Sequence, residues 1–334
     1  MKNLWQALKE RLGWRAAAPA ETLEEAAEKV KRDLDALVEG PRPEETRPLE
    51  VESAEMPPAP SGAVPASAPV AEPELMFTGA FAIAWHSDRG QVRPRNEDAV
   101  LVMTGEQEGS DSVSPFALLL LADGMGGHQA GEMASSLATR VAAAHLLSEL
   151  YIPLLEVRER ASAQLSISEM MVNAVNHANR AVVQRLPGSG TTLTCGMVLG
   201  SRLFVAHVGD SRAYLLRPPD SLRLLTHDHS LVSRLVEMGQ LTNAEAVSHP
   251  QRNVLYRAVG QNSALEVDIF TEVVESGDYI LLCCDGLWSV VPEEEIGRII
   301  LSSASVHQAV RRLVEAANAA GGPDNITVIL ARIG

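Results

Sequence analysis

Four aspartates share one local pattern, in which a carboxylate lies at the end of a strand-like run and close to glycine. These residues are Asp123, Asp210, Asp285 and Asp324. An apolar buried strand cannot itself hold a charge, so the aspartate is the first side chain that is free to emerge at its end. A single Asp-Gly after a strand is most often only a turn. Four such ends, with Glu97 in the first hairpin-like segment, predict a cluster of carboxylates.

Carboxylates gathered at the rim of a buried sheet repel one another, which raises their pKa values unless a cation compensates them. The candidate ligands are all oxygen atoms, because no cysteine or histidine lies at the required spacing, and this favours Mg²⁺ or Mn²⁺ over zinc. Two such ions that share a carboxylate can lower the pKa of a bridging water and direct it at phosphorus. Arg93 could hold the phosphate oxygens by paired hydrogen bonds. The pattern therefore predicts hydrolysis of a phosphoester.

Apolar patterns predict the elements that would position these residues. Strands are expected at 81–90, 118–122, 188–199, 203–216, 223–225, 279–284 and 326–330. Helices are expected at 132–150, 166–186, 231–238, 293–302 and 304–319. The segment 81–100 is expected to form a hairpin, either a solvated one or one that sets the Arg93 guanidinium beside a cation-binding carboxylate. The strands 188–199 and 203–216 are expected to be neighbours.

Composition limits the class of protein. The 334 residues are 46% hydrophobic, which allows one large core with extensions or two domains. A net charge of −15 disfavours nucleic acid as a partner and favours basic phosphoproteins or metal ions. Three cysteines in apolar runs indicate buried, reduced thiols in a cytoplasmic protein. No stretch approaches the roughly 18 apolar residues of a membrane-spanning helix, so we expect a soluble protein.

The N-terminal part differs in composition from the rest of the chain. Residues 1–40 predict amphipathic helices, residues 41–76 a disordered linker rich in Pro, Ala and Glu, and residues 77–334 a globular domain. Within 1–16, one helical face carries Leu4, Trp5, Leu8 and Leu12. That face could dock on the globular domain, on a partner protein or, peripherally, on an anionic membrane.

An ordered set of motifs carries a resemblance to a known family. The motifs are Ser87-Asp88-x-Gly90-x-x-Arg93-x-x-Asn96-Glu97-Asp98, Ala122-Asp123-Gly124-Met125-Gly126-Gly127, Gly190-Thr191-Thr192, Val208-Gly209-Asp210-Ser211-Arg212, Asp228-His229-Ser230, Cys284-Asp285-Gly286-Leu287 and Asp324-Asn325. Over residues 77–334 the chain resembles bacterial metal-dependent protein serine/threonine phosphatases, the PPM or type-2C family.

That resemblance implies an α+β fold, an α-β-β-α sandwich of two antiparallel sheets flanked by helices, with a dinuclear Mn²⁺ or Mg²⁺ centre in a cleft at one edge. The implied metal residues are Glu97, Asp123, the carbonyl of Gly124, Asp210, Asp285 and Asp324. Asp123 would bridge the two ions, Asp285 and Asp324 would complete one of them, and Glu97 with Gly124 would serve the other. Arg93 would bind the substrate phosphate, and Asp210 would help to hold a third, weaker ion. Residues 232–252 match a variable flap.

One position departs from the animal-type pattern, in which a histidine after the Asp-Gly is the proposed general acid. Met125 stands there in this chain. His128 is a possible substitute for this histidine. Such a histidine is more often merely packed or solvated, so protonation of the leaving group by a metal-bound water is favoured. His207 and His229 are expected to be packed rather than catalytic.

The implied activity is that of a protein-serine/threonine phosphatase in signalling, which hydrolyses phosphoserine and phosphothreonine by direct attack of a metal-bridged hydroxide. Asp123 and Asp285 would be catalytic together with Arg93. The substrates would be phosphoproteins, the targets of a serine/threonine kinase. A nucleophilic cysteine is not expected, because Cys284 lacks a phosphate-binding loop. Two alternatives stay open, a catalytically silent sensor or scaffold that acts through its N-terminal extension, and a hydrolase of small phosphoesters.

Overall fold

The computed structural model describes residues 79–334 except 108–113, 126–128, 156–165, 243–244 and 247–248. The predicted N-terminal helices at 1–40, the linker at 41–76 and His128 all lie outside the described residues.

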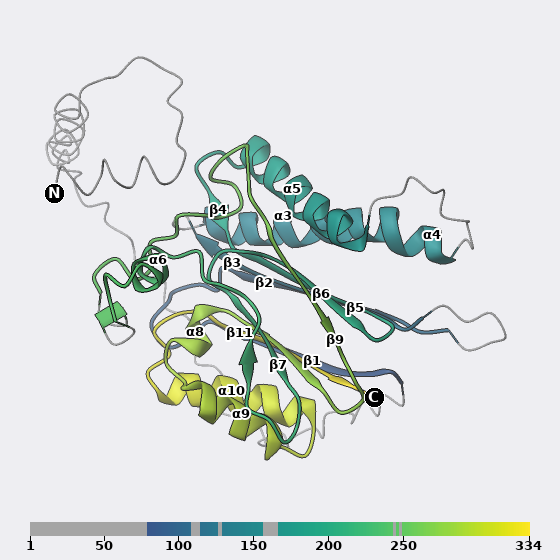
Figure 1. The fold of residues 1–334 in the computed structure, drawn as a ribbon. Coiled ribbons are helices and arrows are strands. Elements are labelled where there is room, and N and C mark those ends of the chain that lie inside the picture. The colour runs from purple at the N-terminus through teal and green to yellow at the C-terminus, as the bar shows by residue number, and fades with distance from the viewer. Residues whose placement is uncertain (1–78, 108–113, 126–128, 156–165, 243–244, 247–248) are drawn as a thin grey trace, which may run out of the picture. The chain divides into compact units, whose positions relative to one another are not determined.

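Two antiparallel sheets form the middle of the molecule (Figure 1). The first has the strand order β1-β11-β10-β7-β8, with bounds Phe81–Asp88, Ile326–Ile333, Tyr279–Cys283, Arg212–Leu216 and Arg223–Leu224. The second has the order β2-β3-β5-β6-β9, with bounds Asp98–Gly105, Phe116–Met125, Leu193–Leu199, Arg202–Val208 and Asp268–Val273. The short β4, Gly190–Thr191, pairs with β3.

Helices cover the outer face of each sheet (Figure 1). Over the second sheet lie α3 and α5, Gln129–Leu146 and Ile167–Arg185, and α3 is continued by the π-helical η1, Leu147–Tyr151, and by α4, Ile152–Leu155. Over the first sheet lie α9 and α10, Glu293–Leu301 and Val306–Ala319. Two shorter helices, α6 and α8, span Leu231–Glu237 and Asp285–Trp288. The expected α-β-β-α sandwich is thereby confirmed.

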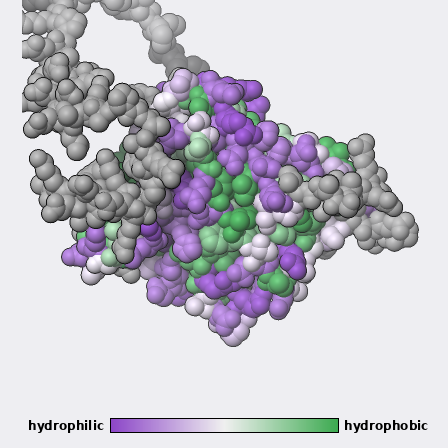
Figure 2. Space-filling view, turned by 45° about the horizontal axis from the view of Figure 1, so that its top comes forward, coloured by the Kyte–Doolittle hydropathy of each residue, from purple (hydrophilic) through white to green (hydrophobic). Residues whose placement is uncertain are grey.

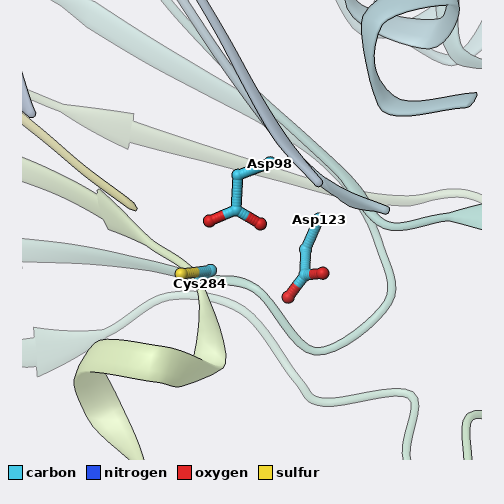
Figure 3. Close-up of side chains that lie close together, drawn as sticks. All are labelled: Asp98, Asp123 and Cys284. Carbon is cyan, nitrogen blue, oxygen red and sulfur yellow. The ribbon is translucent and has the colours of Figure 1, made fainter. Parts of the chain in front are cut away.

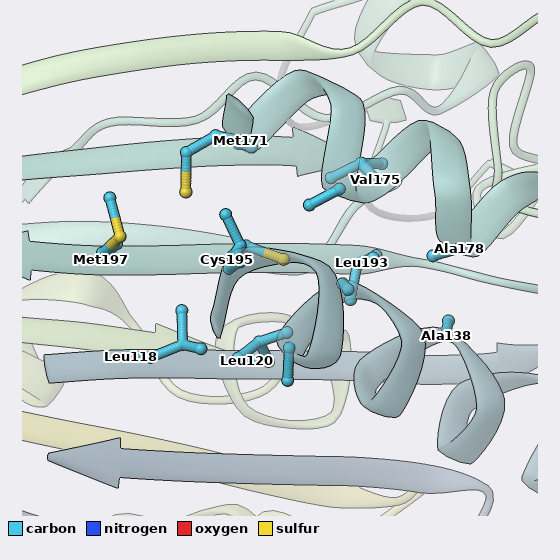
Figure 4. Packing of buried hydrophobic residues seen from close by; sticks show 14 of the residues in the cluster. Leu118, Leu120, Ala138, Met171, Val175, Ala178, Leu193, Cys195 and Met197 are labelled. Carbon is cyan, nitrogen blue, oxygen red and sulfur yellow. The ribbon is translucent and has the colours of Figure 1, made fainter. Parts of the chain in front are cut away.

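The leucine run of β3 explains how α3 and α5 and the two sheets are held together. Leu118 and Leu120 point to one side and pack with α3 and α5 (Figure 4). Leu119 and Leu121 point to the other side and pack between the two sheets. Because successive side chains of a strand alternate between its faces, a continuous apolar run is what a strand buried on both sides requires. A third cluster fills the space between the first sheet and α9 and α10.

Some apolar side chains remain exposed. Trp85, Val92 and Val273 are each more than half exposed, at 55%, 68% and 56%. Figure 2 shows hydrophobic residues (green) lying among hydrophilic ones (purple) on one face of the molecule. Scattered exposed residues of this kind are normal on protein surfaces. None of the helices in the described ranges is both long enough and apolar enough to cross a membrane.

One sequence-based expectation on strand pairing is wrong, and a second holds only in part. The segment 81–100 does not form a hairpin, because β1 pairs with β11 and β2 pairs with β3, in different sheets. The segment 203–216 is divided at Gly209 into β6 and β7, which belong to different sheets, but β6 pairs with β5, as expected for neighbouring strands. Local apolar patterns do not specify which strand is the partner. In both cases the chain crosses from one sheet to the other next to a predicted site residue.

Candidate active site

A cavity of about 400 Å³ receives the candidate site residues from both sheets. Its lining includes all seven that were predicted, namely Arg93, Glu97, Asp123, Gly124, Asp210, Asp285 and Asp324. They come from the 89–97 loop, the end of β3, the β6–β7 connection, the start of α8 and the turn before β11. The structure thus brings together residues that are up to 231 positions apart in sequence, as in the contact between Arg93 and Asp324.

Asp123 is fixed at the end of β3 by the Gly-Thr-Thr motif. The Asp123 amide donates to Thr192 Oγ1 at 2.8 Å, and the Asp123 carbonyl accepts from Thr191 Oγ1 and the Thr192 amide, both at 2.8 Å. With its main chain satisfied in this way, Asp123 is free to direct its carboxylate into the cavity. Burial raises the pKa of Asp123 well above its usual value, and neighbouring carboxylates, Asp98 first among them, add to the effect.

Gly124 has no room for a side chain. A Cβ atom there would lie 2.4 Å from the Gly131 carbonyl oxygen and 2.6 Å from that of Glu97. The Gly124 amide donates to the same Glu97 carbonyl at 3.2 Å. The glycine therefore allows the end of β3 to approach the main chain of Glu97 closely.

Asp98 is a further member of the cluster, which sequence reasoning did not include among the site residues. It lies opposite Asp123 in the β2–β3 ladder, and Figure 3 shows Asp98, Asp123 and Cys284 close together. Their ligand-type atoms all lie within 4.8 Å of one another. Burial raises the pKa of Asp98 to about 7, although Thr327 Oγ1 donates to its Oδ2 at 2.5 Å. The available signal was that Asp98 directly follows Glu97, a predicted site residue.

Asp285 and Asp324 complete the acidic side of the cavity. Burial raises the pKa of Asp285 to about 6, and Asp324 is the largest of the nearby charges that add to this rise. Arg93 Nη2 donates to Asp324 Oδ2 at 2.6 Å, and this hydrogen bond raises the pKa of Arg93 further. The Arg93 side chain is still 48% exposed. Part of its guanidinium is therefore available to an anion that enters the cavity.

Asn325 organises the loop that carries Arg93 and Glu97, a role that the sequence motif alone did not reveal. Its Oδ1 accepts from the Glu97 amide at 2.8 Å. Its Nδ2 donates to the carbonyls of Arg89 and Arg95 at 2.9 and 2.8 Å. One amide side chain thus holds both ends of the loop against the turn before β11.

The cysteines and histidines do not supply an alternative chemistry in the described chain. Cys195, Cys283 and Cys284 are buried, and burial raises the pKa of each thiol. Cys284 Sγ donates to the Asn325 carbonyl at 3.2 Å and accepts from the Thr327 amide at 3.0 Å. Met125 lines the cavity, whereas no histidine of the described ranges does so. The three thiols are therefore buried, and the histidines of the described ranges lie outside the lining of the cavity.

The residues present fit divalent cations. Asp98 Oδ1 and Asp285 Oδ1 are inaccessible to solvent and have no hydrogen-bond partner in the described part of the chain. A buried carboxylate oxygen without a partner is costly, and a cation would remove that cost. Burial also raises the pKa of Asp210 well above its usual value, with Asp285 the largest contributing charge. Clustered acids whose ionised forms lack compensation are what an oxygen-ligated metal site requires.

Two helix-covered antiparallel sheets with such a pocket between their ends define the fold of the PPM-type phosphatases. It is the fold of the serine/threonine phosphatase PstP/Ppp of Mycobacterium tuberculosis, which superimposes with a TM-score of 0.62 at 37% identity over 76% of this chain and 98% of that one. A structure titled as the catalytic domain of PstP with two manganese ions matches with a TM-score of 0.61 at 36% identity, over 76% and 98% of the two chains.

Sequence comparison identifies the family itself. The family model described as Protein phosphatase 2C matches residues 90–331. The serine/threonine phosphatase stp of Listeria innocua is 38% identical over 255 residues, which are 74% of this chain and 93% of that protein. The protein phosphatase PhpP of Streptococcus pneumoniae is 36% identical over 244 residues, 73% of this chain and 94% of the relative. The chain belongs to the protein phosphatase 2C family and is a protein-serine/threonine phosphatase.

Proposed function

We propose that the chain hydrolyses phosphoserine and phosphothreonine in proteins by direct attack of water on phosphorus, without a covalent phosphoenzyme. The observation that carries this proposal is the convergence of buried carboxylates from both sheets on one cavity. An acidic cluster would repel a phosphate monoester unless cations compensate it, so the site makes chemical sense as a metal-dependent one. No thiol in the described ranges lines this cavity.

Two Mn²⁺ or Mg²⁺ ions would be held by residues of this cavity. Asp123 would be shared, Asp285 and Asp324 would hold one ion, and Glu97 with the Gly124 carbonyl would hold the other. Asp210 would contribute to a third, weaker ion. When bound, the ions supply an activated water and compensate the negative charge of the phosphate.

The protein's own groups would bind and orient the substrate. Arg93, which is half exposed and lies beside Asp324 at 2.6 Å, would donate paired hydrogen bonds to the phosphate oxygens. Asn325 would keep Arg93 in place by holding the 89–97 loop at the Arg89 and Arg95 carbonyls. Because no described histidine faces the cavity, the leaving serine or threonine oxygen would take its proton from water.

The test compares phosphate release from a phosphothreonine peptide and from a nitrophenyl phosphate ester, each with manganese and with a chelator. We expect release that depends on metal and is much faster from the peptide. Equal turnover of the two substrates would favour a hydrolase of small phosphoesters. Binding of manganese without any turnover would favour the silent sensor or scaffold.

The N-terminal extension is proposed to direct this activity. Residues 1–40 would dock on a partner protein or a membrane surface, with 41–76 as the linker to the catalytic domain at 77–334. The substrates would be targets of a serine/threonine kinase in the cytoplasm. Deletion of residues 1–75 should then leave peptide turnover intact but change localisation or the set of captured partners, and an unchanged localisation and partner set would contradict this role.

A further inference from the structure

Gly209, directly before Asp210, lies where the chain crosses from β6 to β7. Its φ of 114° is in a region that favours glycine. A Cβ atom at this position would lie 2.5 Å from Thr192 Cγ2. Thr192 is the residue that accepts the Asp123 amide hydrogen bond. The main chain at Gly209, which places Asp210 in the cavity, therefore packs directly against Thr192, the residue that holds the main chain of Asp123.

Two buried histidines hold the peptide groups of Gly209. The Gly209 carbonyl accepts from the His229 amide at 2.7 Å and from His207 Nε2 at 3.0 Å. The Gly209 amide donates to His229 Nδ1 at 3.1 Å. On the other side of Asp210, Trp288 Nε1 donates to the Asp210 carbonyl at 3.0 Å. The main chain around Asp210 is therefore fixed from both directions.

The second ring nitrogen of His229 reaches an ion pair at the edge of the second sheet. Because Nδ1 accepts a hydrogen bond, the proton of the neutral ring lies on Nε2, which donates to Asp268 Oδ2 at 3.2 Å. Asp268 Oδ1 accepts from Arg257 Nη1 at 2.7 Å, and the same Nη1 lies 3.1 Å from His229 Nε2, to which it cannot hydrogen-bond because both nitrogens are donors. Asp268 and Arg257 thus determine the orientation and the tautomer of the ring that holds Gly209.

His229 also contacts the segment 253–258, which contributes Asn253 and Leu255 to the wall of the cavity. Its carbonyl accepts from the Tyr256 amide at 3.0 Å, and the next residue, Ser230, forms a bridge with Leu255. Asn253 and Leu255 line the same cavity as Asp210. One histidine is therefore bonded both to the residue before Asp210 and to a segment that lines the same cavity.

We propose that His229 is a positioning residue, oriented by Asp268 and Arg257, that couples the 253–258 wall of the cavity to the placement of Asp210. This inference rests on the proposed role of Asp210 in binding metal. The sequence predicts only structural packing for His229. The proposal instead gives the Asp228-His229-Ser230 motif a function in the reaction, which it exerts through Asp210.

The test is a double-mutant cycle on turnover of a phosphothreonine peptide. Asp268→Asn removes the charge that orients His229 and should lower kcat by about 10-fold, the size of effect seen for outer partners of metal-site residues. Glu266→Gln is the matched control, because Glu266, whose side chain is 80% exposed, pairs with the other guanidinium nitrogen, Arg257 Nη2, at 2.7 Å. This control should change kcat by less than about 2-fold.

Coupling through Asp210 predicts that the two effects are not additive. Once Asp210→Asn has been introduced, adding Asp268→Asn should cause almost no further loss. Losses that multiply would show that Asp268 acts on the structure in general, and would overturn the inference. An Asp210→Asn variant with unchanged activity would overturn it too, since nothing would then act through Asp210.

Two further measurements keep the result interpretable. His229→Asn keeps an acceptor near Gly209 but cannot reach Asp268, so it should reproduce the effect of Asp268→Asn even if that variant is poorly folded. Hydrogen exchange should increase at the Gly209 amide and in 253–258 in both variants, and unchanged exchange would contradict the coupling. If the effects of Asp210→Asn and Asp268→Asn are additive, only the role of His229 is overturned and the proposed function stands. Full activity of Asp285→Asn would instead refute the metal site itself.

Discussion

Asp98 lies directly opposite Asp123 across the β2–β3 ladder, so two carboxyl groups lie side by side at the start of β2 and near the end of β3. Burial raises the pKa of both groups, and for Asp98 it does so to about 7. Two neighbouring carboxyl groups in a buried site cannot both be ionised unless a cation compensates their charges. The metal-free protein should therefore hold protons in this cluster at a pH at which isolated aspartates have lost them.

The first prediction concerns how stability depends on pH in the presence of a chelator. Asp98 keeps its proton in the folded protein up to about pH 7, but in the unfolded chain only up to its usual value of 3.8. The folded state binds more protons over this range, so the stability contributed by the group is full below about pH 4 and is lost as pH rises toward 7. The stability of the wild type relative to Asp98→Asn, followed by the melting temperature, should fall across that window, by roughly 4 kcal/mol at most.

Saturating manganese is the control for this prediction. A cation replaces the protons as the compensating charge, so the fall between pH 4 and 7 should be reduced or abolished. A constant difference between wild type and Asp98→Asn in chelator would show that Asp98 is ionised normally in the folded state.

The second prediction separates substrate binding from metal binding. Arg93→Ala should lower kcat/KM for a phosphopeptide by about 100-fold, because charge-assisted hydrogen bonds to phosphate contribute about 1.5–3 kcal/mol each. Manganese affinity, measured by calorimetry, should not weaken, since the substitution removes a cation that pairs with Asp324. Arg89→Ala, which changes an exposed arginine of the same loop, should have little effect on either quantity. A loss of manganese binding in Arg93→Ala would contradict the assigned role.

A third prediction follows from the buried thiols. Cys195, Cys283 and Cys284 are all buried, and their thiol pKa values are raised by burial. Since the thiolate is the reactive form, none of the three should react with a thiol reagent in the native protein at neutral pH, and all three should react in denaturant. Rapid labelling of Cys284 in the native state, with loss of activity, would reopen the possibility of a thiol-dependent mechanism.

The sequence is informative about the site because its signals are local. The leucines before Asp123 predict a strand buried on both faces, and β3 has that environment on both sides. The Ser166-x-x-Glu169 pattern predicts the start of α5, where Ser166 and Glu169 form a reciprocal capping box. Each of these features depends on residues within a few positions of one another.

What the sequence does not predict depends on long-range contacts. The pairing of β1 with β11 joins segments about 240 residues apart, and nothing within 81–100 specifies it. Asp98 becomes a cluster member only through the β2–β3 register, and Asn325 becomes a loop clamp only because the turn before β11 lies against residues 89–97. His229 shows the same limit, since its partners Gly209 and Asp268 come from other elements.

The most direct test of the metal-dependent mechanism is phosphate release by Asp285→Asn with saturating manganese, measured beside manganese binding by calorimetry. Asp285 Oδ1 is buried and has no hydrogen-bond partner among the described residues, and a bound cation would compensate it. We predict that Asp285→Asn loses more than about 100-fold in kcat and binds fewer ions or binds them more weakly, while remaining folded. Activity close to that of the wild type with unchanged manganese binding would show that the catalytic metal is not held at Asp285.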